Sequence, residues 1–318
     1  MDRPIEQTMC AILAGLAGLL FVLHTTMTKR DSGRHKKRDD GLVTESTSVR
    51  SCWLADPVTN SAKRAWEVFN LCYGVVWIAV FAYIVYFGVY KDLTRVGYMV
   101  VCGGLCVPIL LSPLVMPSKS DKKLPLLERF GVRANLWMAI YSFIGNYWYT
   151  HYFYCVLRAS YSMPCWRLND VPIQLYFATF FYFCFYHSLS NLALRKVVTT
   201  YVHNAARSVF LVALVLAMSY FVAFMETLTI SAYPDYSFED REMAYKLGSA
   251  FYGIYFIVSF PMFYRFDEWP QQLKQPSLWQ TCVDSMGTGM AILTLLDAVR
   301  LATGVPLQIP LEGASGHR

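Results

Sequence analysis

Charged residues are scarce in this chain of 318 residues, where they make up 16% of the sequence, against about a quarter in soluble domains. The motifs of nucleotide and metal binding are missing as well. The chain contains no G-x-G-x-x-G, no Walker loop, no H-E-x-x-H and no histidine box, and its 6 histidines are scattered. We therefore expect no metal, nucleotide or redox cofactor.

The 9 cysteines form no pattern, since most lie inside apolar segments and none shows the spacing of zinc ligands. They are typical of small buried residues rather than of a disulfide framework. No internal repeat is visible, which argues against a transporter. The net charge of +6 could suggest nucleic acid, but the basic residues lie between apolar segments. We therefore expect no nucleic-acid partner.

Long apolar segments dominate what is present, because 55% of the residues are hydrophobic. Lipid cannot satisfy backbone polar groups, so segments of this length are predicted to be helices. The candidates are roughly residues 9–23, 69–90, 96–116, 134–157, 171–194, 208–230, 245–264 and 280–302. The pattern predicts an all-α polytopic membrane protein with seven core transmembrane helices and an N-terminal anchor helix.

Three parts of the chain differ in composition. Residues 1–50 form a hydrophobic anchor and a basic linker, residues 51–306 the transmembrane domain, and residues 307–318 a C-terminal tail. The apolar run 9–23 is long for a signal-peptide core and short for a full span, and no A-x-A site follows it. We interpret it as a retained anchor; a cleaved or transit-like segment is the alternative.

The basic residues indicate the orientation in the membrane. The segments 29–64, 118–133, 195–207 and 265–280 carry 19 of the 28 lysines and arginines, and the opposite side carries 9. Because basic segments stay in the cytoplasm, the loop around Asp235 is predicted to face the lumen.

Glu226 stands out within the stretch 219–268, because an ionisable group inside an apolar run marks a functional site by default. No basic residue lies three or four positions away. Its apolar neighbours should favour the protonated carboxyl group; they are Phe221, Val222, Phe224 and Met225. An acidic loop and an aromatic run containing Tyr252, Tyr255 and Phe256 follow.

Two other ionisable residues are predicted to lie at a similar depth, His151 and Asp297, each 17 residues into its span. Asp297 has Arg300 three positions on, so a local ion pair is the alternative. His151 could be a buried neutral histidine. His187 and Asn191, one turn apart, could form interhelical hydrogen bonds.

Several long blocks resemble the cycloeucalenol cycloisomerases, the cyclopropyl sterol isomerases of plants and algae. They include GNYWYTHYFYCVLRASYSMPCWRLNDVP, FYHSLSNLALRK, the stretch from LAMSYFVAFMETLTISAYPDYSFED to FPMFYRFDE, and WLADPVTNSAKRAWE. The resemblance covers residues 52–306, in loops as well as spans. It implies conversion of cycloeucalenol to obtusifoliol in the endoplasmic reticulum membrane, without a cofactor. The ring is protonated at the carbon that becomes the C19 methyl, a cation develops at C9, and the C8 proton is lost.

We assign residues to this chemistry from depth and side-chain type, because the resemblance itself assigns none. Glu226 is the predicted acid, with Asp240, Glu242 or Asp297 as alternatives, and His151 is predicted to lie beside Glu226 and to tune or receive its proton. Asn169 is predicted to hold the sterol 3-hydroxyl. The predicted residues of the sterol site are Asn146, Tyr147, Trp148, Asn169, Asp170, His187, Tyr252, Tyr255 and Phe256.

Two other classes of protein are compatible with the same residues. Another membrane sterol double-bond isomerase needs a similar acid, base and aromatic walls, and a non-enzymatic multi-helix sterol-binding protein needs only the aromatic walls. The expected partners are a membrane-embedded sterol and the lipid bilayer. The sequence leaves the oligomeric state open.

Overall fold

The computed structural model describes residues 5–30, 51–230, 233, 235–239, 248–266, 268 and 275–305. Most of them lie in helices, which confirms the predicted all-α class. The α-helices of the described residues are α1 (Ile5–Thr26), α2 (Ser61–Tyr86), α3 (Arg95–Val115), α4 (Phe130–Ile144), the short α5 (Thr150–Val156), α6 (Ile173–Thr200), α7 (Ala205–Ile230), α9 (Ser249–Arg265) and α10 (Leu278–Ala302). Short 3-10 turns lie at η1 (Val89–Asp92), η2 (Asp121–Lys123) and η3 (Leu126–Glu128).

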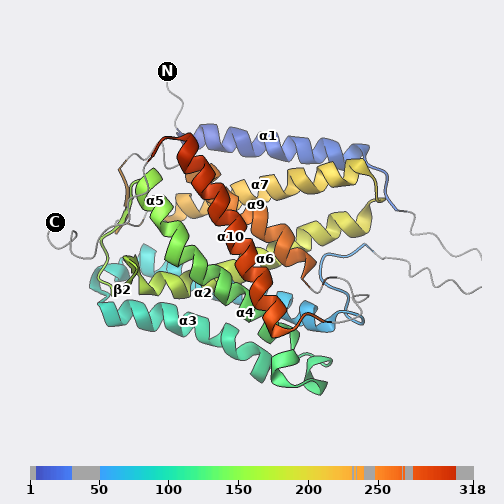
Figure 1. Ribbon diagram of the computed structural model, residues 1–318, viewed down its shortest axis with the longest axis horizontal. Helices are drawn as coiled ribbons and strands as arrows, with labels where there is room; N and C mark the ends of the chain where they lie inside the picture. Colours follow the sequence, from blue (N-terminus) through green and yellow to red (C-terminus); the bar gives the residue numbers. More distant parts are fainter. Residues whose placement is uncertain are drawn as a thin grey trace, which may run out of the picture.

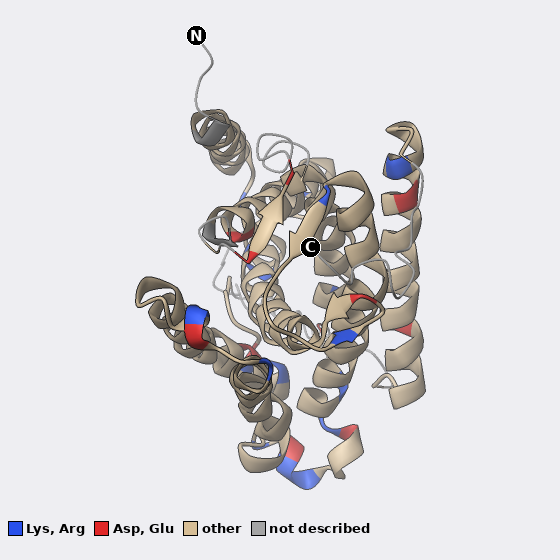
Figure 2. Ribbon diagram, turned by 90° about the vertical axis from the view of Figure 1, so that its left-hand side faces the viewer, with Lys and Arg blue, Asp and Glu red and all other residues tan. Residues whose placement is uncertain are grey.

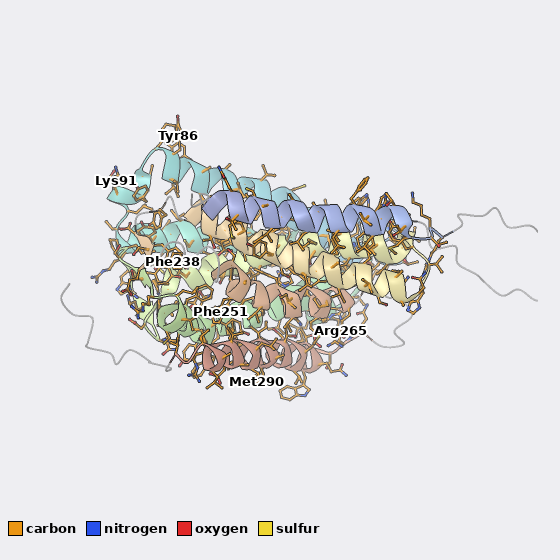
Figure 3. All side chains as sticks on the ribbon, turned by 90° about the horizontal axis from the view of Figure 1, so that it is seen from above. Tyr86, Lys91, Phe238, Phe251, Arg265 and Met290 are labelled. Atoms are coloured by element: carbon orange, nitrogen blue, oxygen red, sulfur yellow. The ribbon has the colours of Figure 1, made fainter. Side chains whose placement is uncertain are left out.

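The helices pack side by side as one bundle. Helix α1 runs along α7 at one edge, and α10 crosses the bundle and packs on α4 (Figure 1). Charged residues colour only a small part of the ribbon (Figure 2). Lys91 and Phe238 lie toward one end of the bundle and Arg265 toward the other (Figure 3). The bundle therefore has two distinct ends and an apolar middle, as a membrane protein requires.

Five helices are long and apolar enough to cross a membrane, judged by length and composition among the described residues. They are the segments Gln7–Thr26, Ser61–Tyr86, Arg95–Val115, Ala205–Leu228 and Leu278–Ala302. Three further spans were predicted, at residues 134–157, 171–194 and 245–264. The described residues of these spans are largely helical, but their helices are not among the five that are long and apolar enough. Helices α4 and α9 have only 15 and 17 residues, whereas α6 has 28.

Helix α2 begins at Ser61, earlier than the predicted residue 69. Its first turns carry Lys63 and Glu67, whose charges broke the apolar pattern in the sequence. Both side chains are buried in the fold, because other charged groups pair with them. Farther along, the ring of Phe185 on α6 lies against Gly74, where a Cβ atom would come within 2.2 Å of the ring. A side chain at this position would push α2 and α6 apart.

The segment between α4 and α5 is a π-helical turn, η4 (Gly145–Tyr149). It makes one helical rod out of residues 130–156 but shifts the side chains that follow it around the helix axis. The turn is fixed by Asn146, whose amide donates to Ser142 O at 2.8 Å and to Thr179 Oγ1 on α6 at 2.6 Å. Tyr149 donates to Gly289 O on α10 at 2.8 Å.

Two small antiparallel sheets lie at one end of the helices. In one, β1 (Ala159–Tyr161) pairs with β4 (Tyr236–Phe238). Tyr161 lies opposite Tyr236, which follows it by 75 residues in the chain. In the other, β2 (Arg167–Leu168) and β3 (Val171–Pro172) form a hairpin. Its two-residue turn is Asn169–Asp170, with φ angles of 51° and 58°. Asn and Asp are residue types that tolerate this left-handed conformation in tight hairpins.

Candidate active site

The carboxyl group of Glu226 is the centre of the candidate site. It lies on α7 and accepts a hydrogen bond from the hydroxyl of Tyr252 on α9 at 2.8 Å. The hydroxyl of Tyr186 on α6 lies 3.5 Å from the same oxygen. The side chain of Glu226 is half-buried, and its carboxyl group is held by hydroxyl groups from two other helices.

Aromatic rings surround the two tyrosines. The Phe256 ring contacts Tyr252 at 5.1 Å and Tyr186 at 5.8 Å between centroids, both with the rings at steep angles. Tyr255 contacts Tyr252 at 4.8 Å, and Tyr182 stacks on Tyr186 at 6.3 Å. The predicted site residues Tyr252, Tyr255 and Phe256 therefore belong to one aromatic cluster with Glu226.

The β1–β4 sheet adds two more hydroxyl groups near Glu226. The rings of Tyr161 and Tyr236 stack at 4.6 Å with an angle of 9° between their planes. Burial raises the pKa of both tyrosines above the ordinary value, and the nearby carboxyl group of Glu226 raises it further. Both groups therefore remain neutral hydroxyls in the neighbourhood of the carboxyl group.

The apolar neighbours of Glu226 on its own helix do not all turn inward, in contrast to the prediction from sequence. Val222 and Phe224 are buried, whereas Phe221 and Met225 are 49% and 38% exposed. The reason is helical geometry, because a single run of apolar residues covers both the bundle side and the outer side of a helix. The apolar surroundings of Glu226 come mainly from other helices and from the β1–β4 sheet.

His151 lies on α5 and is 3% exposed. Neither of its ring nitrogens has a hydrogen-bond partner among the residues that the structure describes. Its ring contacts that of Tyr154 at 5.7 Å, and Asn169 and Asp170 are its polar neighbours. Within the described ranges no hydrogen bond joins His151 to Glu226, so the predicted partnership of the two residues stays a prediction.

Asp297 lies on α10 with a side chain that is 37% exposed. It forms an ion pair with Arg300 at 2.7 Å, which confirms the alternative of a local pair. The hydroxyl of Tyr152 also donates to it at 3.3 Å. Two other alternative acids, Asp240 and Glu242, lie outside the described residues.

Three predicted site residues, Asn146, Tyr147 and Trp148, all fall within the π-helical turn η4. Asn146 is buried and Trp148 is 45% exposed. The carbonyl of Tyr147 accepts a hydrogen bond from Asn169 Nδ2 at 2.6 Å. The turn of the β2–β3 hairpin is thereby fixed to η4, and the Asn169 amide nitrogen predicted to hold the sterol hydroxyl is engaged with the backbone. π-turns occur frequently at functional sites.

His187 and Asn191 form interhelical hydrogen bonds, as predicted. They do not bond each other; their partners are Ser259 on α9 and Glu67 on α2. His187 Nε2 lies 2.9 Å from Ser259 Oγ on α9, and its Nδ1 lies 2.8 Å from Phe183 O. The amide of Asn191 donates to Glu67 at 3.3 Å. Both side chains are fully buried and connect α6 to α9 and α2.

A buried ion network at the other end of the bundle was not predicted. The Arg195 guanidinium bonds Glu67 at 2.6 Å and Glu268 at 2.5 Å, and Lys63 bonds Glu268 at 2.7 Å. Lys63 also donates to the carbonyls of Tyr264 and Phe266 at 3.0 and 2.8 Å, where α9 ends. In the sequence, Lys63 and Arg195 indicate only the orientation in the membrane; the available signal for a pairing is that Lys63 and Glu67 stand one helical turn apart.

Tyr182 and Tyr186 were also missed. They stand four positions apart on α6, and this spacing was the available signal for one shared helix face. Among the residues that the structure describes, no group of histidine, cysteine, aspartate or glutamate could hold a metal ion.

Comparison with known proteins gives one strong similarity. The chain is 38% identical over 267 residues to a protein named cycloeucalenol cycloisomerase from Arabidopsis thaliana, and the match covers 83% of this chain and 94% of that protein. No protein-family model matches the chain, and neither does any solved structure.

Proposed function

Because the chain belongs to the cycloeucalenol cycloisomerase family, we propose that it opens the 9β,19-cyclopropane ring of cycloeucalenol to give obtusifoliol, with Glu226 as the acid. One observation carries this assignment. Glu226 is a carboxyl group in an apolar helix, and tyrosine hydroxyls from two other helices converge on it within an aromatic cluster. Protonation of a carbon–carbon bond needs such an acid, shielded from water.

The proposed reaction is an internal shift of bonds. The protonated carboxyl group of Glu226 gives its proton to the bridging carbon, which becomes the C19 methyl group. The C9–C19 bond breaks and a cation develops at C9. Loss of the C8 proton then leaves its electron pair in the new double bond between C8 and C9. The product is an isomer of the substrate, so the step requires no oxidant and no reductant.

The neighbours of Glu226 support both stages of this step. When Glu226 releases its proton, the hydroxyls of Tyr252 and Tyr186 donate to the carboxylate that remains, and hydrogen bonds to the charged form stabilise it. Aromatic faces attract a cation within about 6 Å of the ring centre. The cluster that includes Tyr182, Tyr255 and Phe256 provides such faces next to the acid.

A second group has to accept the C8 proton, and His151 is our proposal for it. Its ring is buried, and neither nitrogen meets hydrogen-bond geometry within the described part of the chain. Asn169 and Asp170 lie close to the ring, and because neither holds a nitrogen at hydrogen-bond geometry, a nitrogen is available to take a proton. Asp297 is less suited to the role, because it is partly exposed and already paired with Arg300.

The membrane arrangement extends the proposal. We infer that the α4–η4–α5 rod, α6 and α9 cross the bilayer together with α2, α3, α7 and α10, which gives seven core helices, and that α1 is the N-terminal anchor. At about 1.5 Å per residue, the 28 residues of α6 exceed the hydrocarbon thickness. The endoplasmic reticulum is the proposed location, as the resemblance to the cycloeucalenol cycloisomerases implies.

Expression of the chain in yeast fed with cycloeucalenol tests the proposed activity. We expect obtusifoliol in the extracted sterols, and no conversion in cells that carry an empty vector. A parallel feeding with a Δ8 sterol separates ring opening from double-bond migration. Conversion of the Δ8 sterol with cycloeucalenol left intact would contradict the proposal and favour a double-bond isomerase.

A further inference from the structure

Two arginines converge where α1, α6 and α7 meet. Arg30 Nε donates to the carbonyl of Tyr201 at 3.1 Å, and Arg207 Nη1 donates to the same carbonyl at 3.3 Å. Arg207 Nη1 also donates to Val198 O at 3.1 Å. The two guanidinium groups therefore lie side by side at one backbone oxygen, although like charges repel at this separation.

The backbone holds this arrangement in place. After α1 ends, Lys29 pairs with Tyr201 in an isolated antiparallel bridge, and Arg30 N donates to Thr200 O at 2.9 Å. Arg207 stands in the first turn of α7, and its backbone N–H donates to Asn204 Oδ1 at 2.9 Å. Arg207 is 7% exposed, so its position is set by packing as well as by hydrogen bonds.

No carboxylate from the described part of the chain pairs with Arg30 or Arg207. Within the described part of the chain, Arg30 donates through Nε and Arg207 through Nη1. Capping of α6 therefore accounts for one nitrogen of each guanidinium and leaves the remaining N–H groups for another acceptor. The amino-terminal end of α7 adds a positive helix dipole at the same place.

We propose that Arg30 and Arg207 bind the phosphate group of an anionic phospholipid. Guanidinium groups match phosphate oxygens with paired N–H donors. The lipid source is favoured by the neighbouring surface, since exposed apolar side chains lie eight and nine residues before Arg30 on α1 and two and five residues after Arg207 on α7. Phe21 and Val22 are 67% and 55% exposed, and Val209 and Val212 are 57% and 61% exposed.

The arginines thus lie at the boundary between an apolar outer surface and the polar end of the bundle. A phospholipid presents its phosphate at such a boundary while its chains cover the apolar side chains next to it. Lys29 is exposed beside the pair and adds a third positive charge. The site is separate from the Glu226 cluster and does not depend on the proposed ring-opening activity.

Native mass spectrometry of the full chain in detergent tests this site, by titration with phosphatidylserine, phosphatidylcholine and inorganic phosphate. We expect the wild-type chain to bind phosphatidylserine more tightly than phosphatidylcholine, and inorganic phosphate weakly. Each arginine removed should weaken phosphatidylserine binding by roughly fivefold, the usual effect of one basic residue near an anionic membrane surface. Arg30→Gln with Arg207→Gln should therefore weaken it by roughly 25-fold.

Lys122→Gln with Lys123→Gln is the matched control, because it removes two charges from exposed positions elsewhere. This control should bind phosphatidylserine like the wild type. Since Arg207 is buried, Arg30→Gln alone serves as the variant that keeps the fold. Equal weakening in the control, or unchanged binding in Arg30→Gln, would overturn the site. Inorganic phosphate binding as tightly as phosphatidylserine would overturn the lipid assignment.

Discussion

At the scale of single residues, the surroundings of Glu226 are set by tyrosine hydroxyl groups from other helices. The sequence alone predicts Glu226 as a candidate acid, because a carboxyl group within an apolar run can be recognised without knowledge of the fold. It did not identify Tyr186, which lies 40 positions away in the chain and is one of 22 tyrosines. Only the packing of α6 against α7 distinguishes this tyrosine from the others.

Tyr252→Phe should lower kcat by about 10- to 100-fold with little change in KM, because a hydrogen bond to a charged group contributes about 1.5–3 kcal/mol. Tyr186→Phe should have a smaller effect, since its hydroxyl lies 3.5 Å from the carboxyl oxygen, compared with 2.8 Å for Tyr252. The measurement is steady-state conversion of cycloeucalenol by the purified variants. Tyr176→Phe is the control, because its hydroxyl bonds Leu168 O instead. Equal rates for Tyr252→Phe and the control would argue against the contact.

His151→Ala should lower turnover strongly, by about 10²–10⁴-fold if the imidazole accepts the C8 proton, while the protein stays folded in detergent. The measurement combines the rate of obtusifoliol formation with size-exclusion chromatography. A near-normal rate would make His151 a buried structural residue. The sequence suggested this residue from its depth alone, and it could not foresee that both ring nitrogens would lack partners in the described structure.

At the scale of helices and turns, the apolar runs located most of the long helices to within a few residues. The sequence did not predict the positions where charged side chains are buried in ion pairs. Arg195, Glu67, Glu268 and Lys63 come from three distant segments, and no local pattern shows that they meet. It also missed the π-turn η4, because its residues have the same composition as an ordinary helix.

Arg195→Met should destabilise the fold by about 3–5 kcal/mol, because it leaves Glu67 and Glu268 buried with one cation between them. Arg158→Met is the control, since Arg158 pairs with Glu239 on the surface, where both side chains are more than half exposed. An exposed pair contributes about 0–1 kcal/mol. The measurement is the free energy of unfolding in a denaturing detergent titration. Similar losses in the two variants would show that the buried network is not specifically stabilising.

At the scale of the whole molecule, composition alone predicted an all-α membrane protein, and the bundle agrees with that class. The number of crossing helices could not be settled by composition, because α6 carries polar residues that pack inside the bundle. Gln174, His187 and Asn191 are all buried on this helix and reduce its apolar character in the sequence. Their burial depends on neighbouring helices that the sequence does not reveal.

The orientation inferred from basic residues gives a further prediction. A glycosylation acceptor inserted near Asp235 should be modified in the endoplasmic reticulum, and one inserted near Lys122 should not be, because positively charged segments remain in the cytoplasm. The measurement is the shift in gel mobility that an endoglycosidase reverses. The opposite pattern of modification would invert the predicted orientation, in which the loop around Asp235 faces the lumen.

Deuterium incorporation by Glu226→Gln in heavy water tests the central claim most directly. The amide keeps the size of the side chain but has no acidic proton to give. In a single turnover with purified protein, the wild type should place deuterium in the C19 methyl group. The variant should do so about 10²–10⁴-fold more slowly while still binding cycloeucalenol. Deuterium appearing in C19 at the wild-type rate would contradict the role of Glu226 as the proton donor.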